Sequence, residues 1–159
     1  MNKYILTAII VITAVFLDQL TKYLVRIDIP LYSYVEVFQF FNLTHLRNSG
    51  VAFGMLQDMP QQFKLPFYIA VFGIALSVLF MIIKNTEEKN RAMIIGLALI
   101  LSGAIGNSID RFRLGYVTDF LNFHWFNNPS LNWPPFNIAD SCITIGAILV
   151  IATGLFRKE

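Results

Sequence analysis

The stretch Ala92–Ile109, AMIIGLALILSGAIGNSI, contains no charged side chain between Arg91 and Asp110. Three further stretches share this property, at residues 4–17, 65–83 and 141–156. With the tolerated residues beside it, each stretch approaches the roughly 20 residues that a helix needs to cross a bilayer. The sequence therefore predicts four membrane-spanning helices, at about residues 3–26, 65–84, 91–110 and 137–157.

Composition supports a membrane protein and excludes several other classes. Hydrophobic residues make up 56% of the 159-residue chain, charged residues 14%, and the mean hydropathy is +0.61. A soluble domain would carry about 25% charged residues. The net charge of +2 is too small and too scattered to indicate a nucleic-acid partner. Cys142 is alone and His45 lies far from His124, so neither a disulfide nor a zinc site is predicted.

Two long polar connections, at residues 27–64 and 111–136, join the predicted helices. Within the first, the segment 32–40 alternates aromatic and β-branched residues in the manner of a strand. The second is rich in aromatic, Asn and Pro residues, including Trp125, Phe126 and Trp133. We therefore predict an all-α membrane protein, a single domain over residues 1–159, with a small sheet and an aromatic-rich loop outside the bilayer.

The orientation in the membrane follows less directly from the charges. An even number of crossings places both termini on one side and both long connections on the other. Lysine and arginine are equally divided between the two sides, so their count alone does not orient the chain. Several loop-side cations have competing roles in polar motifs, so we favour cytoplasmic termini. All the aspartates fall on the loop side, which gathers carboxylates at one face of the membrane.

Two of these aspartates, Asp119 and Asp140, indicate an enzyme. An ionisable group at membrane depth costs about 2.5–3.5 kcal/mol, so it is a functional candidate. Asp119 lies among apolar neighbours with no helix to cap, where burial raises the pKa of a carboxyl. Asp140 has an equally good structural explanation, because Asn137 and Asp140 match a helix N-cap and its third residue. Two acids that converge on one water would favour acid/base hydrolysis.

Other polar residues form patterns that each allow two interpretations. Asp18, Lys22 and Arg26 are spaced i, i+4 and i+8, which predicts an ion pair on one helix face or cations that reach the headgroups. Asn107 and Arg111 share a helix face and would together hold a carboxylate, unless Arg111 simply pairs with Asp110.

The Asn- and Gly-containing stretch 48–54, which includes Asn48 and Gly50, is either an ordinary turn or a set of donors lining a substrate groove. Gly96, Gly103 and Gly106 allow close approach of a neighbouring helix.

Taken together, these stretches resemble lipoprotein signal peptidase, also called signal peptidase II, a family of bacterial aspartic intramembrane proteases. Five stretches carry the resemblance, in the family's order and over nearly the whole chain: Asp18-Gln19-Leu20-Thr21-Lys22, Asn48-Ser49-Gly50-Val51-Ala52-Phe53, Gly106-Asn107-Ser108-Ile109-Asp110-Arg111, Gly115-Tyr116-Val117-Thr118-Asp119-Phe120 and Phe136-Asn137-Ile138-Ala139-Asp140. Each stretch alone is weak evidence for the family. Five such stretches in the family's order, between four apolar spans, are specific to it.

The resemblance implies a function and a set of site residues. It implies removal of the signal peptide of a prolipoprotein by cleavage before a diacylglyceryl-modified cysteine, with Asp119 and Asp140 as the catalytic pair. Supporting residues would come from the same stretches: Asp18, Lys22, Asn48, Gly50, Asn107, Arg111 and Asn137. It also implies a multi-pass protein of the bacterial cytoplasmic membrane, with cytoplasmic termini and the site under an extracytoplasmic β-cradle. We expect a monomer in contact with membrane lipid that needs no metal or organic cofactor.

Two other classes of function remain as alternatives. A small proton-coupled carrier would use one intramembrane aspartate as a proton relay and would cut no peptide. The chain shows neither an inverted repeat nor a pair of broken helices in matching halves, which disfavours a carrier. A non-enzymatic scaffold would tolerate replacement of both aspartates by asparagine.

Overall fold

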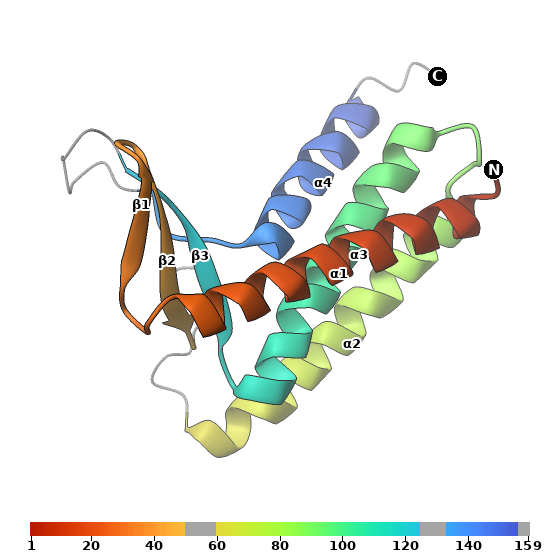
Figure 1. The fold of residues 1–159 in the computed structure, drawn as a ribbon. Coiled ribbons are helices and arrows are strands. Elements are labelled where there is room, and N and C mark those ends of the chain that lie inside the picture. Colours follow the sequence, from red (N-terminus) through yellow and green to blue (C-terminus); the bar gives the residue numbers. More distant parts are fainter. Residues whose placement is uncertain (50–59, 125–132, 156–159) are drawn as a thin grey trace.

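The computed structural model describes residues 1–49, 60–124 and 133–155 (Figure 1). Its four helices are α1 (Lys3–Asp28), α2 (Gln61–Asn85), α3 (Arg91–Leu114) and α4 (Ile138–Leu155). Within the described residues, all four are long and apolar enough to cross a membrane. The prediction of four membrane-spanning helices is confirmed in this sense.

The largest differences from the predicted helix ends are at the end of α3 and at the start of α2. α3 continues past residue 110 to Leu114, and it ends at Gly115, whose φ of 77° lies in the left-handed region that glycine adopts without strain. The Gly115 N–H donates to the carbonyl of Arg111 and closes the last turn. α2 begins at Gln61 rather than 65, so Pro66 lies inside the helix and not in its first turn.

α3 is the central helix, and the other three pack against it. Glycines bring α3 and α4 together: a Cβ on Gly146 would lie 2.5 Å from the Gly96 carbonyl oxygen, and one on Gly103 would contact the Ala139 carbonyl. The predicted close helix approach is therefore confirmed. The start of α4 consequently lies directly against the last turns of α3, where the polar residues of both helices gather.

A three-stranded antiparallel sheet lies beyond the ends of α1 and α3, in the order β1 (Tyr34–Phe38), β2 (Phe41–Asn48) and β3 (Val117–Phe123). β1 falls within the predicted strand and is shorter, because residues 39 and 40 form the turn into β2. The sequence did not predict β2 or β3 as strands. The register pairs Leu46 with Asp119, next to an irregularity that spans Leu43 to Leu46.

An apolar cluster fixes the sheet to the helices. Val25 and Ile29 at the end of α1 pack with Phe120 of β3, and Leu43, Leu121 and Ile138 surround them. The cluster thus joins α1, the sheet and the first residue of α4 around one point. It fixes where Asp119 on β3 lies relative to Asp140 on α4.

Part of the predicted aromatic loop lies outside the described residues, including Trp125 and Phe126, and so does Gly50. Trp133, which is described, is 67% exposed.

Candidate active site

Asp119 lies in the middle of β3 and is 4% exposed. Its two carboxylate oxygens accept hydrogen bonds from two carboxamides, Asn48 Nδ2 at 2.9 Å and Asn137 Nδ2 at 2.7 Å. The pKa of Asp119 is raised to about 6. Burial is the main cause and the negative charge of Asp140 adds to it, while the Asn48 and Asn137 hydrogen bonds and the charge of Lys22 oppose the rise. Asp119 is therefore an acid that can carry a proton near neutral pH.

Asp140 lies in the first turn of α4, where it completes a reciprocal cap. Its backbone N–H donates to Asn137 Oδ1 at 2.9 Å, and the Asn137 N–H donates to Asp140 Oδ2 at 3.2 Å. The predicted N-cap arrangement is confirmed. A further donor, Asn107 Nδ2, lies 2.8 Å from Asp140 Oδ1. The capping contacts leave the Asp140 side chain beside the buried polar residues of α3, so capping does not exclude a catalytic role.

Asn137 connects the two acids. Its carboxamide nitrogen donates to Asp119, while its backbone N–H and its carboxamide oxygen both contact Asp140. The side chain is completely buried, so these contacts lie away from competing water. One residue therefore brings together two carboxylates from a strand and a helix, a juxtaposition that the sequence left open.

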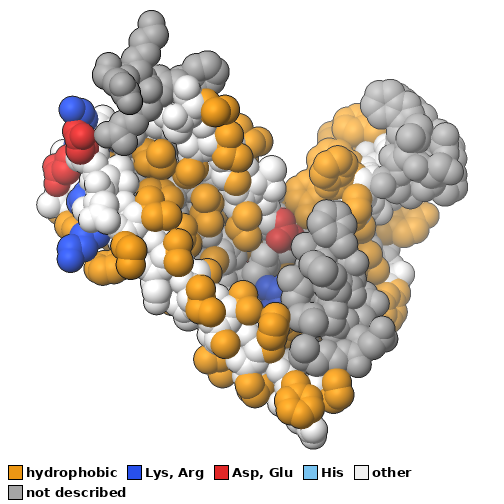
Figure 2. Space-filling model, turned by 180° about the vertical axis from the view of Figure 1, so that it is seen from behind, with side chains coloured by type: hydrophobic (Ala, Val, Ile, Leu, Met, Phe, Trp, Pro, Cys, Tyr) orange, Lys and Arg blue, Asp and Glu red, His pale blue; other side chains and the backbone are white. Residues whose placement is uncertain are grey.

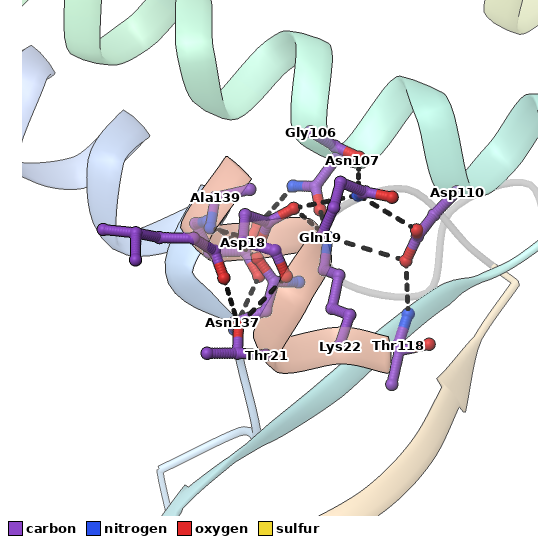
Figure 3. A network of polar contacts seen from close by, with 12 residues as sticks. Asp18, Gln19, Thr21, Lys22, Gly106, Asn107, Asp110, Thr118, Asn137 and Ala139 are labelled. Atoms are coloured by element: carbon purple, nitrogen blue, oxygen red, sulfur yellow. Dashed lines mark hydrogen bonds and ion pairs between the residues drawn. The ribbon is translucent and has the colours of Figure 1, made fainter. Parts of the chain in front are cut away.

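A buried ionic cluster lies behind the two acids (Figure 3). Lys22 is fully buried, and its ammonium is 2.9 Å from Asp18 and 3.5 Å from Asp110. The predicted Asp18–Lys22 ion pair is confirmed. Lys22 Nζ also donates to Asn107 Oδ1 at 3.0 Å, and Asp18 Oδ1 accepts from the Ala139 N–H at 2.9 Å. The cluster thus links α1 to both α3 and the start of α4.

Three members of this cluster were not among the predicted site residues. Gln19 Nε2 lies within 3.2 Å of Asp18, the Gly106 carbonyl and Asp110. Asp110 also accepts from the Thr118 N–H of β3 at 3.1 Å. A Cβ on Gly106 would lie 2.6 Å from Asp18 Oδ2, so glycine leaves room for this carboxylate. All three adjoin predicted residues within the quoted stretches. The sequence also singled out Asp110 as a possible partner of Arg111 and Gly106 as a point of close helix approach, but it gave neither a place in the site.

Other predicted residues lie at the edge of this cluster. Arg26 Nη1 donates to Thr118 Oγ1 at 3.2 Å and lies 3.9 Å from Asp110 Oδ1, so part of its guanidinium points toward the cluster. The guanidinium of Arg111 lies over the ring of Tyr68 on α2, 5.3 Å from its centroid. The Tyr68 hydroxyl donates to the Ser49 carbonyl, directly after Asn48.

The surface is hollowed between α4 and the sheet (Figure 2). An acidic side chain is visible at the bottom of the hollow, and apolar side chains line much of the surface around it. Asp140 is only partly buried, in contrast to Asp119. The arrangement suits acid/base chemistry in an apolar environment. Within the described residues, no three His, Cys, Asp or Glu side chains gather as a metal site.

The fold and the site define a class: a protein with four helices long and apolar enough to span a membrane, a small sheet at one end, and two carboxylates held by asparagine side chains where sheet and helices meet. A sequence model of Signal peptidase (SPase) II matches residues 10–156. The chain belongs to the signal peptidase II family.

Individual relatives agree with this assignment. The chain is 42% identical to the lipoprotein signal peptidase of Maridesulfovibrio salexigens, with 96% of this chain and 97% of the relative covered. It is 40% identical to that of Geobacter sulfurreducens, with coverage of 94% and 91%. Among solved structures, a bacterial membrane enzyme determined by the in meso method at 2.3 Å resolution is similar, with a TM-score of 0.82, 33% identity and coverage of 96% and 93%. These likenesses give no support to the carrier alternative.

Proposed function

We propose that this chain removes the signal peptide of prolipoproteins by cutting one peptide bond before a diacylglyceryl-modified cysteine, with Asp119 and Asp140 as its catalytic pair. The observation that carries the aspartic mechanism is the bridge through Asn137, which contacts both carboxylates. The substrate class follows from membership in the signal peptidase II family and from relatives called lipoprotein signal peptidases.

The reaction requires one ionised and one protonated carboxyl. Two carboxyls that share a buried site do not ionise together easily, so one keeps its proton. The ionised carboxyl takes a proton from water as the water oxygen attacks the scissile carbonyl carbon. The protonated carboxyl gives its proton to the carbonyl oxygen, so the tetrahedral intermediate forms without a bare negative charge.

Collapse of the intermediate completes the reaction. The carbon–nitrogen bond breaks, and the carboxyl that took the proton from water gives it to the leaving amine nitrogen. The other carboxylate regains its proton from one hydroxyl of the intermediate as the new carboxyl group forms. The sum is one water added across one peptide bond, with both aspartates returned to their starting states.

The supporting residues position these groups. Asn48, Asn107 and Asn137 donate carboxamide N–H groups to the two carboxylates, and Asp18 and Lys22 anchor the cluster behind them. Arg111 and the stretch around Gly50 would contact the substrate backbone or its lipid.

We further propose that both termini are cytoplasmic and that the site faces the outer side of the bacterial cytoplasmic membrane. The sheet lies at the opposite end of α1 from the N-terminus, and Asp119 is part of this sheet, so site and sheet would face the same side of the membrane. The protein would act as a monomer in contact with lipid, because each substrate reaches the site within the bilayer. The aromatic segment around Trp133 would lie at the interface with the headgroups.

Cleavage of a diacylglyceryl prolipoprotein by purified protein in detergent tests the proposal. Wild type should cut before the lipidated cysteine, whereas folded Asp119→Asn and Asp140→Asn should each lose at least about a thousandfold in kcat. Asp28→Asn is the matched control, since Asp28 is exposed at the end of α1.

The outcomes separate the alternatives. If either site variant keeps near-normal activity while Asp28→Asn behaves as wild type, the paired-acid mechanism is wrong. A wild type that cuts the unlipidated precursor equally well would refute the requirement for lipid. Failure of the wild type to cut any lipidated precursor would refute the peptidase assignment for this chain.

A further inference from the structure

The two acids have different environments, and this difference bears on how the proposed reaction starts. Asp140 is partly exposed and lies in the first turn of α4, where the helix N-terminus favours negative charge. Asp119 is 4% exposed on a strand and accepts from two neutral carboxamides. The inference that follows rests on the proposed function, since it assigns roles to the same two residues.

Lys22 distinguishes the two acids further. An ammonium group only donates hydrogen bonds, so the carboxamide of Asn107 must turn its oxygen toward Lys22 Nζ, at 3.0 Å. The Asn107 nitrogen then faces the other way and donates to Asp140 Oδ1 at 2.8 Å. With the Asn137 N–H on Oδ2, both Asp140 oxygens face donors. Both Asp119 oxygens also face carboxamide donors, so the difference between the two acids is the Lys22 cation on the oxygen of the Asn107 carboxamide. A carboxamide polarised in this way is a stronger donor, and a charged carboxylate is the stronger acceptor for it.

The ammonium itself is fixed in place. Lys22 is fully buried between Asp18 and Asp110, each of which has further donors: Asp18 accepts from the Ala139 N–H and Asp110 from the Thr118 N–H. A buried lysine held by two carboxylates favours the Asn107 orientation that turns the carboxamide oxygen toward it. Gln19 bridges Asp18 and Asp110 and strengthens the same arrangement.

We propose that Lys22 is a positioning residue for the aspartate pair, which acts through the Asn107 carboxamide to make Asp140 the ionised member and leaves Asp119 as the member that carries the proton. Asp140 then takes the proton from water, and Asp119 gives its proton to the scissile carbonyl oxygen. The ionisable groups around the pair are Asp18, Lys22 and Arg26 on α1 and Asp110 on α3. Consistent with this assignment, burial raises the pKa of Asp119 to about 6.

Infrared spectroscopy tests the assignment without any substrate. Below the pKa of Asp119, the protonated-carboxyl C=O band of the site should persist in Asp140→Asn and disappear in Asp119→Asn. In Lys22→Met a second protonated-carboxyl band should appear, because Asp140 loses the donor arrangement that favours its charged form. This second band should be absent when Asp140→Asn is added. A site band that disappears in Asp140→Asn and persists in Asp119→Asn would overturn the proposal.

Kinetics test the role of Lys22. In Lys22→Met the acid limb of the kcat/KM profile should move to higher pH, because the Asn107 donor to Asp140 loses the cation on its oxygen. The kcat should fall about tenfold with KM within about twofold, and Lys22→Arg should restore part of the shift, because it keeps a buried cation. Lys89→Met is the matched control, since the Lys89 side chain is 83% exposed on the α2–α3 link.

A second variant covers loss of folding. Lys22→Met leaves Asp18 without its cation, whereas Asp110 keeps Arg26 at 3.9 Å. Lys22→Met with Asp18→Asn removes one charge of each sign and leaves no carboxylate of the cluster without a cation. This double variant should be folded and show the same displaced acid limb. If it is folded with the acid limb of the wild type, the positioning role is refuted. If wild type cuts no substrate, the proposed function fails, while the infrared result still decides the assignment of the proton.

Discussion

At Asp119, the burial that favours the protonated carboxyl also makes the stability of the protein depend on pH. Its carboxyl is buried among apolar residues of β3, and this burial raises its pKa to about 6. In an unfolded chain the same carboxyl is exposed to water and has its ordinary pKa of 3.8. The folded protein therefore binds the proton more tightly than the unfolded chain does, and the protein is less stable when Asp119 ionises.

This linkage predicts a pH-dependent effect of Asp119→Asn. In wild type, the Asp119 contribution is fully present below pH 3.8 and is lost as pH rises through about 6, a change of about 3 kcal/mol in the free energy of unfolding. As pH rises from 3.8 to about 6, the Tm of wild type should therefore fall relative to the Tm of Asp119→Asn. Thermal unfolding in detergent across the pH range measures it, and a difference in Tm that is constant across the window would contradict the raised pKa.

Asn137 combines two roles that one substitution can separate. Serine also caps helices well, but its short hydroxyl does not replace the carboxamide nitrogen that donates to Asp119. Asn137→Ser should keep Tm within a few degrees and lower kcat about tenfold or more. Activity and thermal unfolding on the same preparation measure both effects.

Asn2→Ser is the matched control for this substitution, because Asn2 caps α1 through its side chain and lies at the far end of the helices. It should leave kcat unchanged. Equal losses of activity in the two variants would show that capping alone explains the effect at Asn137.

At the scale of elements, the contact between α1, α3 and α4 depends on small residues as much as on charges. Gly106 lies on the face of α3 where Asp18 crosses, and Gly96, Gly103 and Gly146 line the contact with α4. Helices in lipid gain little from apolar burial, so close backbone approach and buried polar contacts carry the association.

Gly106→Ala should therefore displace Asp18. Its added methyl would lie 2.6 Å from Asp18 Oδ2, and relief of that overlap disturbs the Lys22 ion pair. We expect a loss of about 1–3 kcal/mol in stability and a clear loss of activity. Gly73→Ala on α2 is the matched control, because its added methyl meets open space and should stabilise the helix slightly. Comparable Tm values for the two variants would refute the steric argument.

At the scale of the whole molecule, the polar groups divide between two ends. At one end, Lys3 Nζ donates to the carbonyls of Lys84 and Thr86, and Arg91 donates to that of Met1, so the N-terminus is fixed to the α2–α3 link. At the other end lie the sheet, the acid pair and the buried ionic cluster. Because the two ends differ, labelling one position at each end shows how the chain is oriented in the membrane.

In a Cys142→Ser background, a membrane-impermeant maleimide should label Tyr34→Cys in intact cells, because β1 is exposed and we place it outside. Asn2→Cys should react only after permeabilisation, since we place the N-terminus in the cytoplasm. Labelling of both variants in permeabilised cells controls for accessibility. The reverse pattern in intact cells would invert the proposed topology.

Much of this protein follows from local sequence. The four spans are predicted from uncharged runs, because a helix in lipid must satisfy its backbone internally and present apolar side chains. The Asp18–Lys22 pair and the Asn137–Asp140 cap are predicted from spacing, because both contacts form within one or two helical turns. Asp119 and Asp140 are candidates from their place in apolar segments, and the resemblance over five stretches added the family and the supporting residues.

Other features required the tertiary structure. The sequences of β2 and β3 show no strong alternation of polar and apolar residues. Their pairing depends on neighbours far away in sequence. The contacts of Asn137 with Asp119 and of Lys22 with Asn107 cross 18 and 85 residues. Local periodicity and spacing therefore determined the helices, the caps and the kind of side chains at the site. Only the packing of α3 against α1 and α4, with the sheet fixed by Val25, Ile29 and Phe120, decided which carboxylates meet, because distances between elements depend on how they pack.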